Sequence, residues 1–376
     1  MKPITRIVSL ASLCCALFLT AQGCDDTATS EPQLVNPSVG VHYFIVDGPG
    51  GRDLSTAIWY PAPEGTEGEP FVYSGFLSRE AIQDAPIHEG GPWPLVVFSH
   101  GHEGVKEQSI FFTETLAKAG YIVVAPDHVG NTFFIQDHDL DPILNHLRPL
   151  DVTAVLDRIE SPSEDDPDYF TTAIDMAHVA VAGHSRGGYT AVVSSGASVD
   201  VPQYYTDYCA THAEEALCVD FPGTDAQHAL GDARIDASIP ISPANYEAFV
   251  SGGLGDVQIP SLVITGRLDQ STPVEGTVEP IYEGLPAPKY FWILEEADHF
   301  TFSDLCNVYH LLDEETQAGF GVACDPDNAL SLDDAHTLTM EAVLNFLDWN
   351  LKGDMDGKTR LEAMGNDQIT LTFDAP

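Results

Sequence analysis

The sequence predicts an α/β protein: a doubly wound, mostly parallel sheet with an N-terminal antiparallel hairpin and loop insertions. Short apolar runs, such as residues 95–98 and 121–125, are typical of strands covered on both faces. These runs alternate with segments of helical periodicity, and strands separated by helices pair in parallel. The sequence contains no internal repeat and no second domain boundary, so residues 39–376 are expected to form one domain.

The predicted elements follow one another in a regular order. Residues 41–46 and 54–60 flank a turn rich in Gly and are expected to form a hairpin. Later apolar runs predict strands at residues 95–98, 121–125, 178–182, 237–241, 261–265 and 290–294. Helical spacing predicts helices at residues 107–119, 150–159, 189–195 and 337–351. Three connections are longer than usual, at residues 128–148, 200–235 and 304–333, and are interpreted as insertions near the strand ends, where such sheets bind ligands.

The charge balance limits the possible partners. The chain has 58 acidic and 15 basic residues and a formal net charge of -43 at pH 7. Such a surface repels phosphate backbones, so nucleic acid is not an expected partner. It also repels anionic lipid head groups, so membrane contact is expected only through a covalent N-terminal anchor. The sequence predicts no oligomeric state.

The first 23 residues are typical of an export signal. Lys2 and Arg6 precede an apolar run at residues 7–19 that is too short to span a bilayer. The small residue before Cys24 resembles a bacterial lipobox, although Ala stands at position 21 where Leu is usual. Cys24 is then the lipid-attachment residue, residues 24–38 form a flexible tether, and the protein is a membrane-anchored lipoprotein facing the periplasm or the cell exterior. The alternative is ordinary cleavage that leaves Cys24 a free thiol.

The cysteine count agrees with export. Two of the seven cysteines leave with the signal segment and Cys24 takes the lipid, which leaves four: Cys209, Cys218, Cys306 and Cys324. An even number outside the cytoplasm predicts two disulfides. Proximity favours Cys209–Cys218 and Cys306–Cys324, which is one of three possible pairings. No C-x-x-C spacing is present, so these cysteines do not predict a metal site.

The sharpest motif is Gly-His-Ser-Arg-Gly at residues 183–187, between a predicted strand and a predicted helix. A tight strand-to-helix turn lifts a serine hydroxyl above the sheet, and the small flanking residues permit the backbone crowding. Ser185 is therefore the predicted nucleophile. The competing interpretation is a Gly-rich turn without chemistry.

A serine nucleophile needs a base, and the base needs an orienting acid. In this kind of fold the acid and then the histidine follow the serine along the chain. Asp269 and His299 each follow a predicted strand, so they are the predicted acid and base. The alternative acids are Asp236, Glu295 and Asp298. The other late histidines, His310 and His336, do not follow strands and are expected to be solvated.

Acyl transfer also needs hydrogen-bond donors for the oxyanion. The backbone amides of Arg186 and His102 are the predicted donors, with that of Gly101 as the alternative to His102. The pair His100 and His102 is interpreted as structural, and the acidic segment at residues 137–141 as a solvated loop; neither is interpreted as a metal site.

Together these residues resemble the α/β-hydrolase superfamily, and within it the secreted esterases related to dienelactone hydrolase, platelet-activating-factor acetylhydrolase and chlorophyllase. The matching segments, within about residues 40–350, are Val97-Phe98-Ser99-His100-Gly101, Val124-Ala125-Pro126-Asp127-His128 with Gly130-Asn131-Thr132, Arg148-Pro149-Leu150-Asp151-Val152, Gly183-His184-Ser185-Arg186-Gly187-Gly188 and Asp298-His299-Phe300-Thr301-Phe302-Ser303-Asp304. The resemblance implies a Ser–His–Asp esterase without metal or organic cofactor. Ser185 stands where true dienelactone hydrolases have Cys, which argues against a dienelactone substrate. Polyester-cleaving cutinase-like enzymes share this general layout.

The resulting hypothesis is a serine hydrolase that cleaves carboxylic esters through an acyl-enzyme intermediate. Its expected substrate is a small-molecule or lipid-like ester with a neutral, short or medium acyl group. Phe133, Phe134 and Ile135 either line an acyl pocket or pack the insertion around them. The alternatives are a non-catalytic surface lipoprotein that retains the fold and a serine peptidase of the same fold.

Overall fold

The computed structural model describes residues 37–375 except residues 76, 138–142, 165, 201–205, 207–208, 211–217, 219–227, 310–323 and 325–329. The predicted signal segment, the lipid-attachment residue Cys24 and the tether up to residue 36 lie outside the described residues. The same is true of His310, of residues 138–141 in the acidic loop, and of much of the two later insertions.

Within the described residues, ten strands form one sheet in the order β14-β13-β12-β11-β8-β6-β7-β2-β1-β5. They are β1 (Ser38–Gly48), β2 (Arg52–Ala62), β5 (Ile82–Gln83), β6 (Trp93–Ser99), β7 (Ile122–Pro126), β8 (Ile174–His184), β11 (Ala237–Ile241), β12 (Ser261–Gly266), β13 (Lys289–Leu294) and β14 (Ile369–Asp374). The six strands from β7 through β13 in this order run parallel. The prediction of a doubly wound, mostly parallel sheet is therefore confirmed.

The helices follow the strands as expected for crossover connections. They are α1 (Ile110–Lys118), α2 (Leu144–Glu160), α3 (Tyr169–Thr172), α4 (Arg186–Ser194), α7 (Glu279–Gly284), α8 (Leu305–Val308), α10 (Leu332–Lys352) and α11 (Met355–Glu362). Two small pairs lie outside the main sheet, β3 (Val72–Tyr73) with β4 (Leu77–Ser78) and β9 (Ser198–Val199) with β10 (His228–Ala229). No helix in the described part of the chain is long and apolar enough to cross a membrane.

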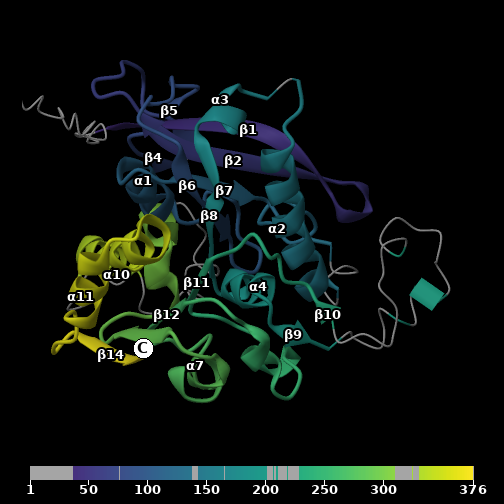
Figure 1. The fold of residues 1–376 in the computed structure, drawn as a ribbon, viewed down its shortest axis with the longest axis vertical. Coiled ribbons are helices and arrows are strands. Elements are labelled where there is room, and N and C mark those ends of the chain that lie inside the picture. The colour runs from purple at the N-terminus through teal and green to yellow at the C-terminus, as the bar shows by residue number, and fades with distance from the viewer. Residues whose placement is uncertain are drawn as a thin grey trace, which may run out of the picture. The chain divides into compact units, whose positions relative to one another are not determined.

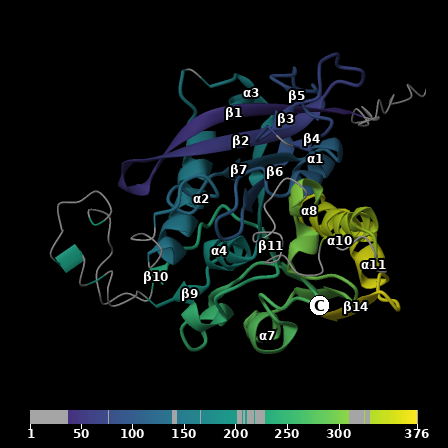
Figure 2. The same cartoon turned by 180° about the vertical axis from the view of Figure 1, so that it is seen from behind.

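Side chains that alternate along the central strands pack into two separate hydrophobic cores. Val96 and Phe98 of β6 pack with apolar residues of α1 and α10, whereas Leu95 and Val97 pack with apolar residues of α2. Helices α1 and α10 accordingly cover one face of the sheet, and α2 and α4 cover the other (Figures 1 and 2). Because both faces of each central strand are buried, the strands appear in the sequence as continuous apolar runs.

The N-terminal hairpin is present and longer than predicted. Strands β1 and β2 pair antiparallel from Ser38 opposite Ala62 to Gly48 opposite Arg52. Gly50 and Gly51 in the turn have φ angles of 73° and 71°, a conformation that glycine adopts without steric cost. Strand β2 then pairs antiparallel with β7, which attaches the hairpin to the parallel part of the sheet.

Two parts of the structure differ from the prediction. Helix α2 begins at Leu144 and not at residue 150, although Pro149 lies inside it. Proline removes one helical hydrogen bond, but the first turn is held by the burial of Leu144 and Leu147. The chain also continues past the predicted closing helix into α11 and β14. Strand β14 is an edge strand with mostly exposed side chains, so it lacks the apolar run that identified the central strands.

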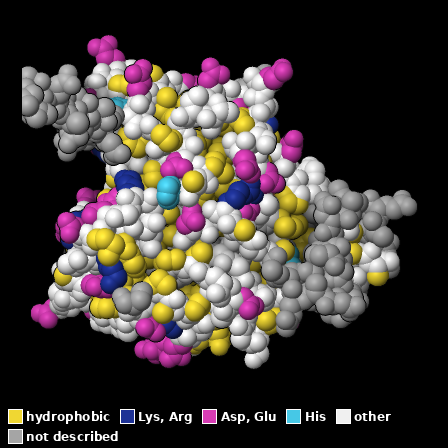
Figure 3. Space-filling model, in the orientation of Figure 1, with side chains coloured by type: hydrophobic (Ala, Val, Ile, Leu, Met, Phe, Trp, Pro, Cys, Tyr) yellow, Lys and Arg dark blue, Asp and Glu magenta, His cyan; other side chains and the backbone are white. Residues whose placement is uncertain are grey.

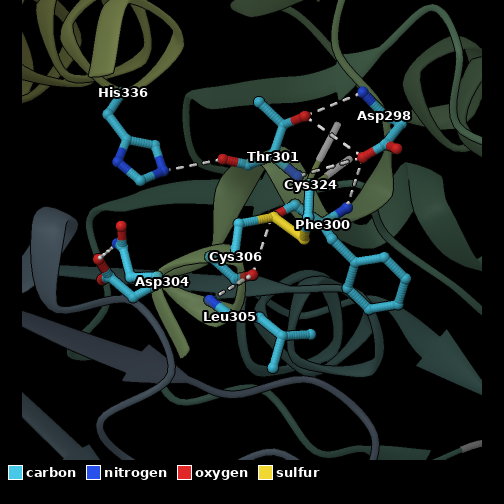
Figure 4. Close-up of a disulfide and its surroundings, with 10 residues drawn as sticks. Asp298, Phe300, Thr301, Asp304, Leu305, Cys306, Cys324 and His336 are labelled. Atoms are coloured by element: carbon cyan, nitrogen blue, oxygen red, sulfur yellow. Dashed lines mark hydrogen bonds between the residues drawn. A yellow bond between two sulfur atoms is a disulfide. The ribbon is translucent and has the colours of Figure 1, made fainter. Parts of the chain in front are cut away.

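Two disulfides join Cys209 to Cys218 and Cys306 to Cys324, which is the pairing that proximity favours. The second bond joins Cys324 to Cys306 of α8, the helix that directly follows the turn at residues 298–304 (Figure 4). Disulfides form in oxidising compartments, so this chemistry is compatible with an exported protein.

The backbone is most tightly packed where β8 turns into α4. A Cβ atom at Gly187 would lie 1.9 Å from the carbonyl oxygen of Ser99, at the end of β6. A Cβ atom at Gly183 would lie 2.3 Å from the carbonyl oxygen of Gly187. The two glycines therefore let the first turn of α4 rest directly on the ends of β6 and β8.

We expect Gly187→Ala to lower the free energy of unfolding by about 1–3 kcal/mol or more, because backbone atoms must move to admit the methyl group. Urea unfolding measures the loss. The matched control is Gly255→Ala, since a Cβ atom there meets nothing within 4 Å. This control should change stability by less than about 1 kcal/mol. Equal stability of the two variants would contradict the packing argument.

Candidate active site

Ser185 lies in a sharp turn between β8 and α4. Its backbone has φ 60° and ψ -120°, an unfavourable conformation for a residue with a side chain. The turn is held by hydrogen bonds from the Ser185 amide to Ile241 O (2.9 Å) and from the Ala244 amide to Ser185 O (3.1 Å). Such a strained turn at the carboxyl end of a central strand is the geometry expected of a nucleophile elbow.

Asp269 follows β12 and is buried, with 4% of its surface exposed. Its Oδ1 accepts hydrogen bonds from the amides of Ser271 (2.9 Å) and Thr272 (2.7 Å). Its Oδ2 accepts hydrogen bonds from the Thr272 hydroxyl (2.8 Å) and from His299 Nδ1 (2.8 Å). Burial alone raises the pKa of Asp269, but the hydrogen bond and charge of His299 and the Thr272 contacts outweigh burial and hold this pKa below its ordinary value. The carboxylate is thus kept ionised and fixed in orientation.

His299 follows β13 and begins a 3₁₀ turn that ends at Phe302. The Asp298 side chain caps this turn by accepting hydrogen bonds from the amides of Phe300 (3.0 Å) and Thr301 (3.3 Å) (Figure 4). The other side of the turn is held by His336 Nε2, which donates a hydrogen bond to Thr301 O (2.9 Å). The turn is therefore rigid, and it aims the imidazole of His299 at Asp269.

The three alternative acids have other partners. Asp298 caps the turn just described, and Glu295 pairs with Arg267 at 3.0 Å. Asp236 accepts a hydrogen bond from the Val179 amide at 2.9 Å. Of the four candidate acids, Asp269 is the one that contacts the His299 ring.

The residue before the predicted nucleophile contacts the predicted base. The rings of His184 and His299 lie 4.6 Å apart, and His184 Nε2 donates a hydrogen bond to His299 O (2.8 Å). Nδ1 of His299 forms the hydrogen bond with Asp269, so Nε2 is the nitrogen that can accept the proton of the Ser185 hydroxyl. In the described part of the chain, the side chains of Ser185 and His299 share no hydrogen bond with each other. Contacts of this kind are often long before substrate binds.

A side-chain relay connects the three loops of the site. The Gly101 amide donates a hydrogen bond to Gln108 Oε1 (2.8 Å), and Gln108 Nε2 donates one to His184 Nδ1 (2.9 Å). His184 completes the relay through its hydrogen bond to His299 O. This pattern requires a neutral His184 that carries its proton on Nε2. Burial lowers the pKa of His184 to about 3, so the ring is neutral at neutral pH.

The predicted oxyanion donors lie on both sides of Ser185. Arg186 is the first residue of α4, so its amide is at the helix N-terminus. The loop after β6 borders Ser185 from the other side, since a Cβ atom at Gly101 would lie 3.4 Å from Ser185 Cβ. The Gly101 amide already donates to Gln108, so within this loop the predicted donor is the next amide, that of His102.

The two histidines of the H-x-H pair have different environments. His100 is fully buried, and its Nε2 accepts a hydrogen bond from the His128 amide (3.0 Å). The side chain of His102 is 44% exposed, and its Nδ1 forms a 2.9 Å hydrogen bond with the Asn131 side chain. The two rings therefore serve different contacts.

The expectation that His336 is solvated is wrong. Its ring is buried, stacks on Phe111 with 3.6 Å between centroids and supports the His299 turn through Thr301 O. Position at the start of an amphipathic helix gave no sign of this contact. The sequence also gave no sign of Gln108 or Thr272 as site residues, because both act through contacts between distant segments.

The loop after β7 presents Phe133, Phe134 and Ile135, which are 56%, 61% and 59% exposed. The Phe133 amide donates a hydrogen bond to Gly104 O (3.0 Å), so this loop is attached to the loop of the predicted oxyanion donor. Exposed apolar side chains next to the loop of the predicted oxyanion donor are suited to contact an apolar ligand group.

Comparisons with known proteins agree with this architecture. A family model for platelet-activating factor acetylhydrolase, isoform II, matches residues 71–139. The solved structure of a ferulic acid esterase from Streptomyces cinnamoneus has a TM-score of 0.62 and 21% sequence identity with this chain, and the match covers 90% of this chain and 97% of the esterase. A search of curated proteins gives no match. The chain thus has the α/β-hydrolase fold.

We expect His184→Leu to lower the free energy of unfolding by about 1–3 kcal/mol for each of the two polar partners that it leaves buried, Gln108 Nε2 and His299 O. Chemical denaturation at pH 7 measures this loss. The control is His178→Leu in the same strand, because the His178 side chain is 49% exposed. The control should change stability by less than about 0.5 kcal/mol.

The same variant carries a pH test. The pKa of His184 is lowered to about 3, so between the ordinary imidazole value near 6.5 and pH 3 the unfolded chain binds a proton that the folded chain does not. The wild-type protein therefore loses stability as the pH falls through this window. His184→Leu should lose less stability than wild type over the same pH range, and an unchanged pH profile would contradict the buried neutral ring.

Proposed function

We propose that this protein is a serine hydrolase that cleaves carboxylic esters through an acyl-enzyme intermediate. The observation that carries the proposal is the 2.8 Å contact between Asp269 and His299 beside the strained turn of Ser185. The names of the matching family model, an acetylhydrolase, and of the similar solved structure, a ferulic acid esterase, support an ester substrate.

In the proposed mechanism, His299 Nε2 takes the proton of the Ser185 hydroxyl as its oxygen attacks the ester carbonyl. Asp269 keeps the other imidazole proton on Nδ1 and stabilises the charged ring that forms. The amides of Arg186 and His102 donate hydrogen bonds to the oxyanion. His299 then protonates the leaving alcohol, and water repeats these steps on the acyl-enzyme to release the acid and restore Ser185.

The proposed substrate is a neutral ester with a short or medium acyl group. The net charge of -43 disfavours anionic substrates at long range. The exposed loop of Phe133, Phe134 and Ile135 offers apolar contact to the acyl or alcohol group. A panel of p-nitrophenyl esters of increasing acyl length, together with a peptide anilide, separates an esterase from a peptidase of the same fold.

We expect Ser185→Ala to lower kcat for a p-nitrophenyl ester by about 10³–10⁶-fold, and Asp269→Asn to lower it by about 10³–10⁴-fold because the asparagine favours the wrong tautomer of His299. Steady-state kinetics measures both losses. A fluorophosphonate probe should label the wild-type protein at Ser185, as mass spectrometry of the labelled peptide would show.

The matched control for the nucleophile is Ser195→Ala, at the far end of α4, where the hydroxyl donates a hydrogen bond to Ala191 O. This variant should retain turnover and probe labelling. A wild-type protein that neither reacts with the probe nor hydrolyses any ester would favour a non-catalytic surface lipoprotein instead.

We also propose that Cys24 carries the lipid anchor that the sequence predicts. The wild-type protein expressed in a bacterium should partition into the detergent phase of Triton X-114, and Cys24→Ser should move it to the aqueous phase because the acyl chains are lost. The control is Ser30→Ala in the same tether, which should not change partitioning. An unmodified N-terminal peptide in the wild-type protein would rule out the anchor.

A further inference from the structure

The loop that carries the predicted oxyanion donor is held by a buried cation. Arg148 lies in α2 and is fully buried. Its Nη1 donates a hydrogen bond to His100 O (2.7 Å) and its Nη2 donates one to Gly101 O (2.7 Å). Burying a guanidinium is costly unless its donors are satisfied, so these two carbonyl oxygens are major partners of the charge.

The nearest buried carboxylate is engaged elsewhere. Asp151, one turn later in α2, forms an ion pair with Arg52 and a 2.9 Å hydrogen bond with His128 Nδ1. The hydrogen bonds that Arg148 donates from its guanidinium go instead to the loop after β6. Asp151 thus acts on Arg148 through its charge, whereas the hydrogen bonds of the guanidinium are made to the loop.

Gly101 is held at both of its polar groups. Its amide donates to Gln108 Oε1 and its carbonyl accepts from Arg148 Nη2. The carbonyl also accepts from His100 Nδ1 at 2.8 Å. His100 Nε2 accepts a hydrogen bond from the His128 amide, so the proton of this neutral ring is on Nδ1. Burial and the charge of Arg148 lower the pKa of His100 well below its ordinary value, which keeps that arrangement fixed.

The carbonyl of Gly101 and the amide of His102 belong to one peptide unit. A trans peptide is planar, and its C=O and N–H groups point in opposite directions. Anchoring Gly101 O on Arg148 therefore turns the His102 N–H away from Arg148. Two hydrogen bonds to the same carbonyl, one of them from a cation, also polarise the peptide and make its N–H a stronger donor.

We propose that Arg148 is a positioning residue for the oxyanion hole: it orients and polarises the peptide unit whose N–H, that of His102, donates to the oxyanion. This inference rests on the proposed function. Arg148 itself touches neither the substrate nor the reacting atoms, and it acts through the Gly101–His102 peptide.

The test compares Arg148→Met and Arg148→Lys with wild type. Arg148→Met keeps much of the side-chain volume and removes both donors, so kcat for a p-nitrophenyl ester should fall by about 10²–10³-fold with KM changed by less than about threefold. Arg148→Lys keeps the charge but has no planar fork to bridge two carbonyls, so its kcat should lie between those of Arg148→Met and wild type.

Inhibition by an aryl boronic acid is a second measurement, and its inhibition constant should not change if the role of Arg148 were merely structural. Its tetrahedral adduct with Ser185 places an oxygen in the oxyanion hole, so its inhibition constant should rise in parallel with the fall in kcat. Arg158→Met is the matched control, since Arg158 lies in the same helix and pairs with Asp166 at 2.9 Å. This control should keep kcat within about threefold of wild type at a temperature where both are folded.

Should Arg148→Met not fold, Arg148→Lys and Gln108→Leu carry the test. Gln108→Leu removes the other anchor of Gly101 and should lower kcat and boronate affinity together. An Arg148→Lys or Arg148→Met protein with wild-type kcat, or with a raised KM and unchanged boronate affinity, overturns this inference but leaves the proposed function standing. A wild-type protein without Ser185-dependent ester turnover refutes the proposed function, and the inference with it.

Discussion

The close approach of α4 to the ends of β6 and β8 is the constraint on which the site depends. Only a residue without a side chain fits at Gly187, where the backbone faces Ser99 O, and Ser185 adopts its strained conformation two residues before this contact. Ser99 is the last residue of β6, so the same contact places the loop that follows β6 beside Ser185. The proposed nucleophile and the loop proposed to stabilise its oxyanion are therefore positioned by one packing interaction, and the surrounding hydrogen bonds add to it.

At the carboxyl end of the sheet, three buried histidines are neutral, whereas the buried Asp269 is charged. Desolvation lowers the pKa values of His100, His128 and His184, so each ring is neutral, and its hydrogen bonds determine which nitrogen carries the proton. Asp269 remains a carboxylate despite its burial because amide, hydroxyl and imidazole donors surround it. A buried array of Ser99, His128 and Asp151 has the same residue types as the proposed triad, with contacts of 2.8 Å and 2.9 Å. All three residues are fully buried, so this array supports the loop after β6 and has no access to a substrate.

The sequence could predict what is encoded in local patterns. Apolar runs locate the central strands, and the rule that acid and base follow strands after the serine selects Asp269 and His299, which form a hydrogen bond in the structure. It could not predict the contacts that depend on long-range packing. Neither the role of Arg148 nor that of Gln108 can be predicted from sequence, because their partners lie in other segments: Arg148 donates to two main-chain carbonyls, and Gln108 contacts the Gly101 amide and the His184 ring. His336 was misplaced in solvent for the same reason, and β14 was missed because an edge strand does not need an apolar run.

The charges of the protein act differently on the proposed substrate and on its transition state. Acidic side chains are spread over the face in Figure 3, in keeping with the net charge of -43, so the long-range field repels an anion that approaches the protein. At the proposed oxyanion hole the nearby charges are the opposite, since Arg148 and Arg186 are close enough for their charges to interact. A neutral ester meets no long-range penalty, and in the proposed mechanism its carbonyl oxygen becomes negative only as Ser185 attacks. The local cations and amides therefore act on charge that exists in the transition state and not in the free substrate, which is the condition under which binding energy accelerates a reaction.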